Sequence, residues 1–162
     1  MQEFSFKMYD DETFCVVGYE GDEANVVIPA VHGSTPVTII FDDVFKGHSE
    51  ITSVTIPDTV TNIGAFAFDG CVNLRQIKLP AALEDLWQYA FANCGIEEIT
   101  LPSKMVSLAS FTFQNCKNLK RVNCNPGLKK IHAWAFSGCE ALKELYYGNG
   151  TQVSPLAFEA HE

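Results

Sequence analysis

The sequence is short of positive charge and of long apolar segments. Its 162 residues carry 11 Lys and Arg against 20 Asp and Glu, a formal net charge of −9. Because proteins bind phosphate backbones through an excess of Lys and Arg, this balance argues against a nucleic-acid partner. There is no run of eighteen apolar residues, so we expect no membrane span. The opening MQEFSFKMYD also lacks the basic region and apolar stretch of a secretory signal.

These absences lead to an expectation about location. We expect a cytoplasmic protein if the sequence is full length, because it shows no export signal. If the sequence is a fragment, the alternative is a cell-surface or secreted protein. The six cysteines are expected to be free thiols, since a chain of this size does not need disulfides to hold a core.

Sequence motifs for catalysis are also missing. We find no glycine-rich phosphate loop, no nucleophile elbow and no zinc-protease helix. None of the four histidines has a metal-ligand spacing to another histidine. We therefore expect no cofactor, no metal and no catalytic residues. The remaining enzymatic alternative is a Cys–His pair built from His48 and Cys71, or from His132 and a cysteine, and it is the least favoured.

A 22–23-residue repeat dominates what is present. With 47% hydrophobic and 19% charged residues, the chain is expected to form one packed domain. The segment IGAFAFDGCVNLRQIKLP (63–80) recurs along it. Aligned on their strand-like ends, the copies cover residues 37–57, 60–80, 83–102, 105–125 and 128–148, and a sixth begins at 153. Self-similarity at this period indicates a leucine-rich repeat solenoid.

Each repeat contains a predicted strand and a predicted turn. The LxxIxL spacing of Leu74, Ile77 and Leu79 predicts a short parallel strand whose inward side chains stack on those of neighbouring coils. The preceding AFAFDGC is too short for a stable helix, so it is predicted to be a helical or 3₁₀ turn on the convex side. This turn is expected to direct a phenylalanine inward in every coil: Phe45, Phe68, Phe91, Phe113 and Phe136.

The repeat resembles that of a known family. Residues 63–80 match the pattern IGxxAFxxCxxLxxIxLP of BspA-like bacterial leucine-rich repeat proteins almost position by position. The resemblance implies a right-handed α/β horseshoe arc with a parallel sheet on its concave face and an N-terminal β-hairpin. It also implies surface display, adhesion and protein binding. Departures from the pattern are His48 in place of the repeat Cys and Thr112 in place of the Ala before Phe.

The repeats and the resemblance divide the single domain into three parts. Residues 1–36 are assigned to an N-terminal hairpin and half-repeat cap, residues 37–148 to five repeats, and residues 149–162 to a truncated sixth repeat or C-terminal cap. The strand of the last full repeat, LKELYY, is expected to expose an edge. Weak self-association through this C-terminal edge is therefore one hypothesis.

Four of the cysteines form a column at equivalent repeat positions: Cys71, Cys94, Cys116 and Cys139. Equivalent atoms in adjacent coils lie about 4.8 Å apart along a line. A line of thiols does not surround a metal tetrahedrally, and this spacing exceeds the roughly 3.8 Å between the Cβ atoms of a disulfide. We interpret the column as a structural ladder of buried thiols.

The candidate binding surface is the concave sheet face. Strand side chains alternate, so the residues between the inward positions point outward. They are Ser53, Thr55, Gln76, Lys78, Glu98, Thr100, Arg121, Asn123, Glu144 and Tyr146. This mixed polar surface suits a protein or peptide partner, with Arg121 and Tyr146 as anchors. The alternative is that these residues are ordinary solvated strand positions.

The sequence therefore predicts a non-catalytic leucine-rich repeat module that binds a protein or peptide. Five strands of about six residues give a face of roughly 400 Å², about half of the roughly 800 Å² per partner in a standard interface. Weak binding, peptide binding or additional use of the arc's edges is therefore expected. The alternative function is a segment of a bacterial cell-surface adhesin or host-interaction protein.

Overall fold

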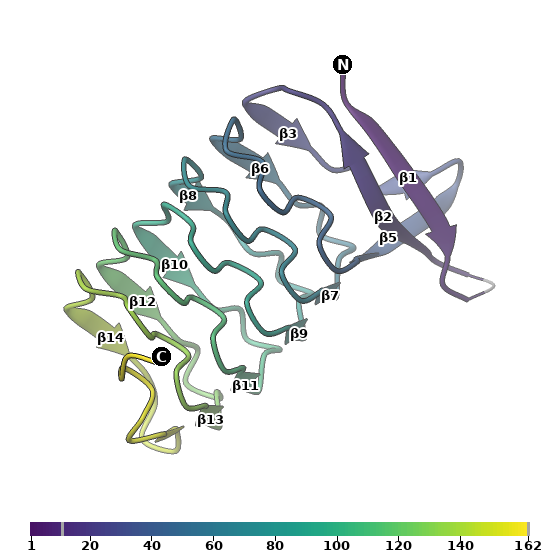
Figure 1. Ribbon diagram of the computed structural model, residues 1–162. Helices are drawn as coiled ribbons and strands as arrows, with labels where there is room; N and C mark the ends of the chain where they lie inside the picture. The colour runs from purple at the N-terminus through teal and green to yellow at the C-terminus, as the bar shows by residue number, and fades with distance from the viewer. Residues whose placement is uncertain (11, 162) are drawn as a thin grey trace.

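The protein is a stack of similar coils that begins with an antiparallel hairpin. The computed structural model describes residues 1–10 and 12–161. Successive coils lie one behind the next from the N-terminal to the C-terminal end (Figure 1). Each coil contributes two short strands, so the stack carries two rows of strands.

The N-terminal end of the stack is covered by the hairpin. Strands β1 (Glu3–Met8) and β2 (Phe14–Glu20) pair antiparallel, and β2 continues in parallel onto β5 (Thr35–Ile40). Strand β4 (Val31–His32) forms a second, tight hairpin with β5. Apolar side chains of the long hairpin pack on the first coil, so the hairpin closes the core at this end.

The first strand row follows the predicted LxxIxL segments. Its members are β3 (Asn25–Val27), β6 (Ser53–Thr55), β8 (Gln76–Ile77), β10 (Glu98–Thr100), β12 (Arg121–Asn123) and β14 (Glu144–Tyr146). They pair in parallel, with equivalent repeat positions opposite each other, within two groups: β3-β6-β8 and β10-β12-β14.

The second strand row lies at the start of each repeat. It consists of β5, β7 (Asn62–Ile63), β9 (Asp85–Leu86), β11 (Ser107–Leu108), β13 (Lys130–Ile131) and β15 (Gln152–Val153). These strands also pair in parallel, as β5-β7-β9 and β11-β13-β15. Both rows are therefore interrupted next to the same coil, residues 83–102.

The prediction of an α/β fold with helical or 3₁₀ turns is wrong. No residue described by the structure is helical; the chain forms a β-solenoid of strands and turns. In the turn of the second coil, Phe66, Phe68 and Gly70 donate their N–H groups to carbonyls of the next coil, whereas Ala67, Asp69 and Cys71 donate within their own turn. A helix would need all of these donors inside its own segment.

Left-handed residues explain why the turn does not become a helix. Two positions in the turns of the five full repeats have positive φ. The first is Asp43 in the first turn and an aromatic residue such as Phe66 (φ 59°) in the others, and the second is a Gly or Asn such as Gly70 (φ 83°) or Asn93 (φ 57°). A right-handed helix cannot continue through a left-handed residue. The turn therefore directs alternate N–H groups sideways, toward the neighbouring coil.

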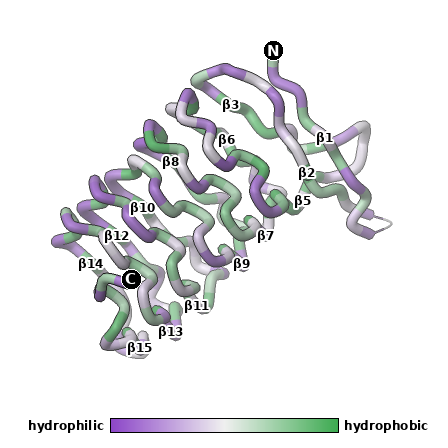
Figure 2. The backbone as a smooth tube through the Cα atoms, viewed as in Figure 1, coloured by the Kyte–Doolittle hydropathy of each residue, from purple (hydrophilic) through white to green (hydrophobic). Residues whose placement is uncertain are grey.

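The core is a continuous apolar column enclosed by the coils. The predicted inward phenylalanines are confirmed: Phe45, Phe68, Phe91, Phe113 and Phe136 are at most 1% exposed. Their rings stack with centroids 5.0 to 5.9 Å apart. The hydropathy of the residues follows the same repeat, with apolar and polar stretches alternating along successive coils (Figure 2). Phe158, half exposed, continues the stack at the C-terminal end.

The interruption of the first row, between β8 and β10, lies beside a missing residue. Cys71 and Leu74 are separated by two residues, whereas only Gly95 separates Cys94 from Ile96 at the equivalent place. The chain turns so tightly here that a Cβ on Gly95 would lie 2.4 Å from the carbonyl oxygen of Val72. The shortened coil loses strand register with its N-terminal neighbour, although Glu97 N–H still donates to the Arg75 carbonyl at 3.0 Å.

Candidate functional site

The ten residues predicted to form a binding face lie together on the first strand row. Seven are exposed and the remaining three, Arg121, Asn123 and Glu144, are half-buried. Between them lie the inward residues of the same strands, with Val54, Ile99 and Val122 at most 7% exposed. The alternation of the strand thus places polar groups outside and apolar groups inside.

Strand register fixes the order of these side chains. Glu98, Arg121 and Glu144 are opposite one another on β10, β12 and β14, and Thr100, Asn123 and Tyr146 form the next line. On the N-terminal side, Ser53 lies opposite Gln76. The face therefore consists of two regular arrays on paired strands, one on β6 and β8 and one on β10, β12 and β14, and it requires no ordering of a loop before it can bind a partner.

Arg121, expected to be an anchor for a partner, is held by two carboxylates of its own chain. Its Nε donates to Glu144, and its Nη1 lies 3.7 Å from Glu98 Oε1. The hydrogen bond from Arg121 lowers the pKa of the Glu144 carboxyl, and Glu144 raises the pKa of Arg121. Arg75, one residue before β8, has its Nη1 3.5 Å from Glu97 Oε1. Both arginines of the sequence are thus already paired within the chain.

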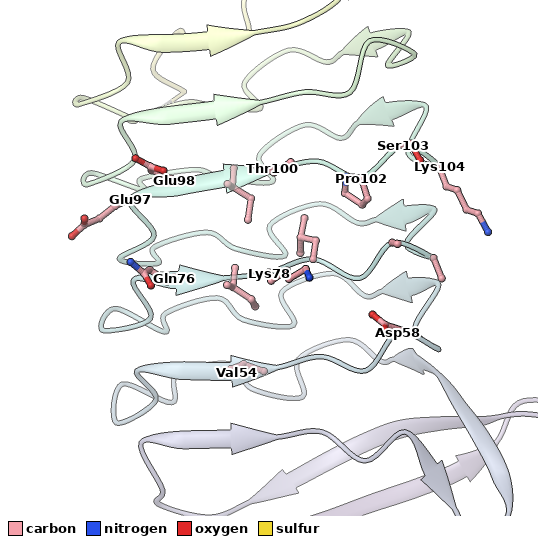
Figure 3. A pocket seen from close by; sticks show the side chains of 15 residues that line it. Val54, Asp58, Gln76, Lys78, Glu97, Glu98, Thr100, Pro102, Ser103 and Lys104 are labelled. Atoms are coloured by element: carbon pink, nitrogen blue, oxygen red, sulfur yellow. The ribbon is translucent and has the colours of Figure 1, made fainter.

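A groove of about 1310 Å³ opens on this face at the interruption. It spans β6, β8 and β10 and the linkers that follow them (Figure 3). Gln76 and Glu98 lie at one end, Lys78 and Thr100 in the middle, and Ser103 with Lys104 at the other end. Leu79, Ala81, Ala82 and Pro102 add apolar surface to its lining. Sequence reasoning missed this groove, although the one-residue shortening of the third repeat was visible.

The cysteine column forms a ladder of hydrogen bonds between coils. The Sγ atoms of Cys71, Cys94, Cys116 and Cys139 each donate to the carbonyl of the core phenylalanine one coil earlier, at 3.0 to 3.2 Å. Burial raises the pKa of all four thiols, that of Cys71 and Cys139 to about 12. All six cysteines are free. The ladder therefore joins adjacent coils through neutral thiols.

The proposed His48–Cys71 pair is not arranged as a nucleophile and its base. The Cys71 thiol donates to the Phe45 carbonyl at 3.2 Å, and His48 Nδ1 lies 2.5 Å from Glu50 Oε1. The nucleophilic form of cysteine is the thiolate. A thiol whose pKa is near 12 is protonated at neutral pH, so this pair does not supply an activated nucleophile.

An aromatic ribbon on the turns was not foreseen. Phe66, Tyr89, Phe111 and Trp134 are half-buried and stack with centroids 4.6 to 5.5 Å apart. Lys46 Nζ lies 4.8 Å from the ring centroid of Phe66, and His161 meets Trp134 edge-on at 4.8 Å. The signal was the aromatic residue two positions before each core phenylalanine from Phe68 onward. The ribbon joins coils along the side of the turns.

The described part of the chain holds neither a metal-binding cluster nor a membrane-spanning helix. No group of three or more His, Cys, Asp or Glu side chains within residues 1–10 and 12–161 is placed to hold a metal ion. The same residues contain no helix of the length and apolarity needed to cross a bilayer.

Comparison with known proteins identifies relatives of this architecture. Six copies of the BspA type leucine-rich repeat region match residues 38–162. A leucine-rich repeat protein of T. pallidum is 25% identical with a TM-score of 0.75, over 90% of this chain and 79% of that one. No curated protein matches the chain.

Two further solved structures share the fold. A leucine-rich cell surface protein of Faecalibacterium prausnitzii is 25% identical with a TM-score of 0.64; the match covers 92% of this chain and 53% of that one. A leucine-rich repeat protein of Bacteroides capillosus is 29% identical with a TM-score of 0.60, over 75% of this chain and 94% of that one. The chain therefore spans only about half of the F. prausnitzii protein.

Proposed function

The chain belongs to the BspA-type leucine-rich repeat family, and on this basis we propose that it is a non-catalytic module that binds a protein or peptide. The binding surface in this proposal is the outward face of the first strand row. The observation that carries it is the exposed polar array itself, held in register on paired strands. Preorganised surfaces of this kind bind without the entropy cost of ordering a loop.

The chemistry of the thiols supports the non-catalytic part of the proposal. The ladder cysteines are protonated and hydrogen-bonded to backbone carbonyls, so their arrangement serves the joining of coils. The polar groups of the first strand row are spread along a surface and do not converge on one reacting atom, as an active site would require.

A second candidate function is a segment of a cell-surface adhesin. The F. prausnitzii relative is described as a cell surface protein, and it is nearly twice as long as the part matched by this chain. In this candidate the chain acts at the cell surface, and further repeats enlarge a face that is small by itself. The first strand row remains the recognition surface in both candidates.

A steric block on the first strand row tests the proposal. Peptides selected from a random display library on the immobilised wild-type chain are re-tested on Thr100→Trp, which adds bulk without charge to an exposed residue of the row. The matched control is Gln152→Trp, an equally exposed residue of the second strand row.

We expect the selected peptides to lose binding to Thr100→Trp by about tenfold or more and to bind Gln152→Trp as they bind the wild type. Thermal melting of both variants checks that the fold is intact. Peptides that bind Thr100→Trp normally, or that are blocked only by Gln152→Trp, would contradict the proposed surface.

A further inference from the structure

The charges around the groove are not equally available to a partner. Glu97 is paired with Arg75, and Glu98 shares the single charge of Arg121 with Glu144. Within residues 1–10 and 12–161, Lys78 and Lys104 have no carboxylate within 4 Å of Nζ. Among the carboxylates that line the groove, only Asp58 is likewise unpaired in the described chain. The groove therefore presents two ammonium groups that no carboxylate of the described chain pairs, beside the carboxylate of Asp58 and the carboxylate of Glu98, which shares Arg121 with Glu144.

Lysines without an ion-pair partner also lie beyond the groove, farther along the first strand row. A smaller hollow of about 310 Å³ is lined by Ala141 and by five charged residues: Glu98, Lys120, Arg121, Lys143 and Glu144. Arg121 lies between Glu144 and Glu98 there and offsets one of these two carboxylate charges. Neither Lys120 nor Lys143 is within ion-pair distance of a carboxylate among the described residues, so the two lysines outnumber the one carboxylate charge that is left over. The positive groups thus extend across several coils of a chain whose net charge is −9.

We propose that this groove binds an acidic peptide segment in an extended conformation, with Lys78 and Lys104 as the groups that recognise its carboxylates. The proposal rests on the proposed peptide-binding function and specifies its ligand. The groove volume exceeds the roughly 300–1,000 Å³ of a small-molecule site, so it has room for several peptide residues. Leu79, Ala81, Ala82 and Pro102 provide apolar contacts between the charged groups.

The proposal makes the binding dependent on ligand charge and on salt. Exposed ion pairs contribute modestly and are screened at high ionic strength. A neutral peptide of the same length would keep the apolar contacts and lose the ion pairs. The acidic ligand should therefore bind more tightly than its amide counterpart at low salt, and this advantage should disappear at about 0.5 M salt.

The experiment uses two fluorescein-labelled peptides of about ten residues, one alternating Glu and Ala and the other Gln and Ala. Fluorescence anisotropy measures their binding to the wild-type chain and to Lys78→Glu/Lys104→Glu. The matched control is Lys129→Glu/Lys130→Glu, which makes the same charge change at two exposed residues in and beside strand β13 of the second row.

The expected result is about tenfold tighter binding of the Glu peptide than of the Gln peptide. This preference should be lost in Lys78→Glu/Lys104→Glu and retained in Lys129→Glu/Lys130→Glu. Equal binding of the two peptides, no binding of either, or an equal loss in both variants would overturn the proposal. An oligonucleotide or a sulfated glycan that binds more tightly than the Glu peptide, with the same dependence on Lys78 and Lys104, would also overturn it.

The two proposals fail in different ways. If library-selected peptides are blocked by Thr100→Trp but show no preference for acidic residues, the acidic ligand is wrong and the peptide-binding face stands. If no selected peptide responds to Thr100→Trp, both the face and the acidic ligand are wrong.

Discussion

The cysteine at each repeat has a specific bonding role that its apolar character alone does not explain. The Phe68 carbonyl accepts the N–H of Cys71 within its own coil, at 3.1 Å, and the thiol of Cys94 from the next coil, at 3.0 Å. A carbonyl oxygen has two lone pairs, so both donors are accommodated. Cysteine fits this position because it is small, apolar and still able to donate a weak hydrogen bond.

Removing one of these hydrogen-bonded thiols should lower the free energy of unfolding more than removing a buried thiol that makes no such hydrogen bond. Cys94→Ala loses packing and the hydrogen bond to Phe68, whereas Cys15, 2% exposed, donates to no carbonyl among the described residues. We expect Cys94→Ala to lower the free energy of unfolding by about 0.5–1 kcal/mol more than Cys15→Ala, measured by urea denaturation. Equal losses would show that the thiol only fills space.

The raised thiol pKa values predict sensitivity to alkali. Burial raises the pKa of Cys71 from its ordinary value of 9.0 to about 12. Above pH 9 the unfolded chain releases the thiol proton while the folded chain retains it, so stability falls as the pH rises toward 12. Each such thiol contributes a loss of up to about 1.4 kcal/mol per pH unit in this window.

Urea denaturation at several pH values between 9 and 11 measures this loss. The wild type should lose stability more steeply with rising pH than Cys71→Ala, which lacks one of the titrating thiols. Between pH 7 and pH 8 the free energy of unfolding of the two chains should change with pH in the same way, because the thiol is protonated in both the folded and the unfolded chain. If the stability of the two chains changed with pH in the same way up to pH 11, the raised pKa of Cys71 would be contradicted.

At the scale of elements, the sequence predicted one strand row correctly and missed the other. The LxxIxL spacing located β6, β8, β10, β12 and β14. The second row has only two residues per strand in most coils, such as Asn62–Ile63, and two residues carry no recognisable alternation. The turn was mistaken for a helical one because sequence propensity does not reveal that Phe66 or Tyr89 adopts positive φ.

The shortened coil gives a test at the scale of the element. Gly95→Ala would place its Cβ 2.4 Å from the Val72 carbonyl oxygen, and backbone atoms there cannot move aside cheaply. We expect a loss of roughly 2–3 kcal/mol in the free energy of unfolding. Gly150→Ala is the control, because no atom lies within 4 Å of its Cβ position, and it should change stability by less than about 0.5 kcal/mol. Similar values for the two variants would contradict the tight turn.

At the scale of the whole molecule, stability comes from contacts between neighbouring coils. A single coil cannot bury its own inward face, so each ring of the phenylalanine stack depends on the next. Phe91 is fully buried in the middle of the stack, whereas Phe158 is 50% exposed at its end. Deleting a ring should therefore lower the free energy of unfolding more in the middle of the stack than at its end.

Replacing the two phenylalanines by alanine measures this dependence. Phe91→Ala should lower the free energy of unfolding by about 3–5 kcal/mol, the usual cost of a large cavity in a core. Phe158→Ala removes a half-exposed ring and should cost about 1–2 kcal/mol. Denaturant unfolding followed by circular dichroism gives both values, and a comparable loss at the two sites would contradict the account of the core.

The candidate surface was only partly predictable. Strand alternation was sufficient to place Ser53, Gln76, Thr100 and their equivalents on one face. Sequence could not show which charges are free, because the pairing of Arg121 with Glu98 and Glu144 depends on register between coils 23 residues apart. Nor could it show the groove, because a missing residue alone does not reveal which strands lose their pairing.

Nuclear magnetic resonance tests the central claim, recognition by the first strand row, most directly. A library-selected peptide is titrated into the isotopically labelled chain, and the backbone amide resonances are followed. The account predicts saturable shifts concentrated at Gln76, Lys78, Thr100 and their neighbours in the row, with Asn62, Asp85 and Lys130 of the second row unchanged. Shifts centred on the second row, or spread evenly over the molecule, would contradict it.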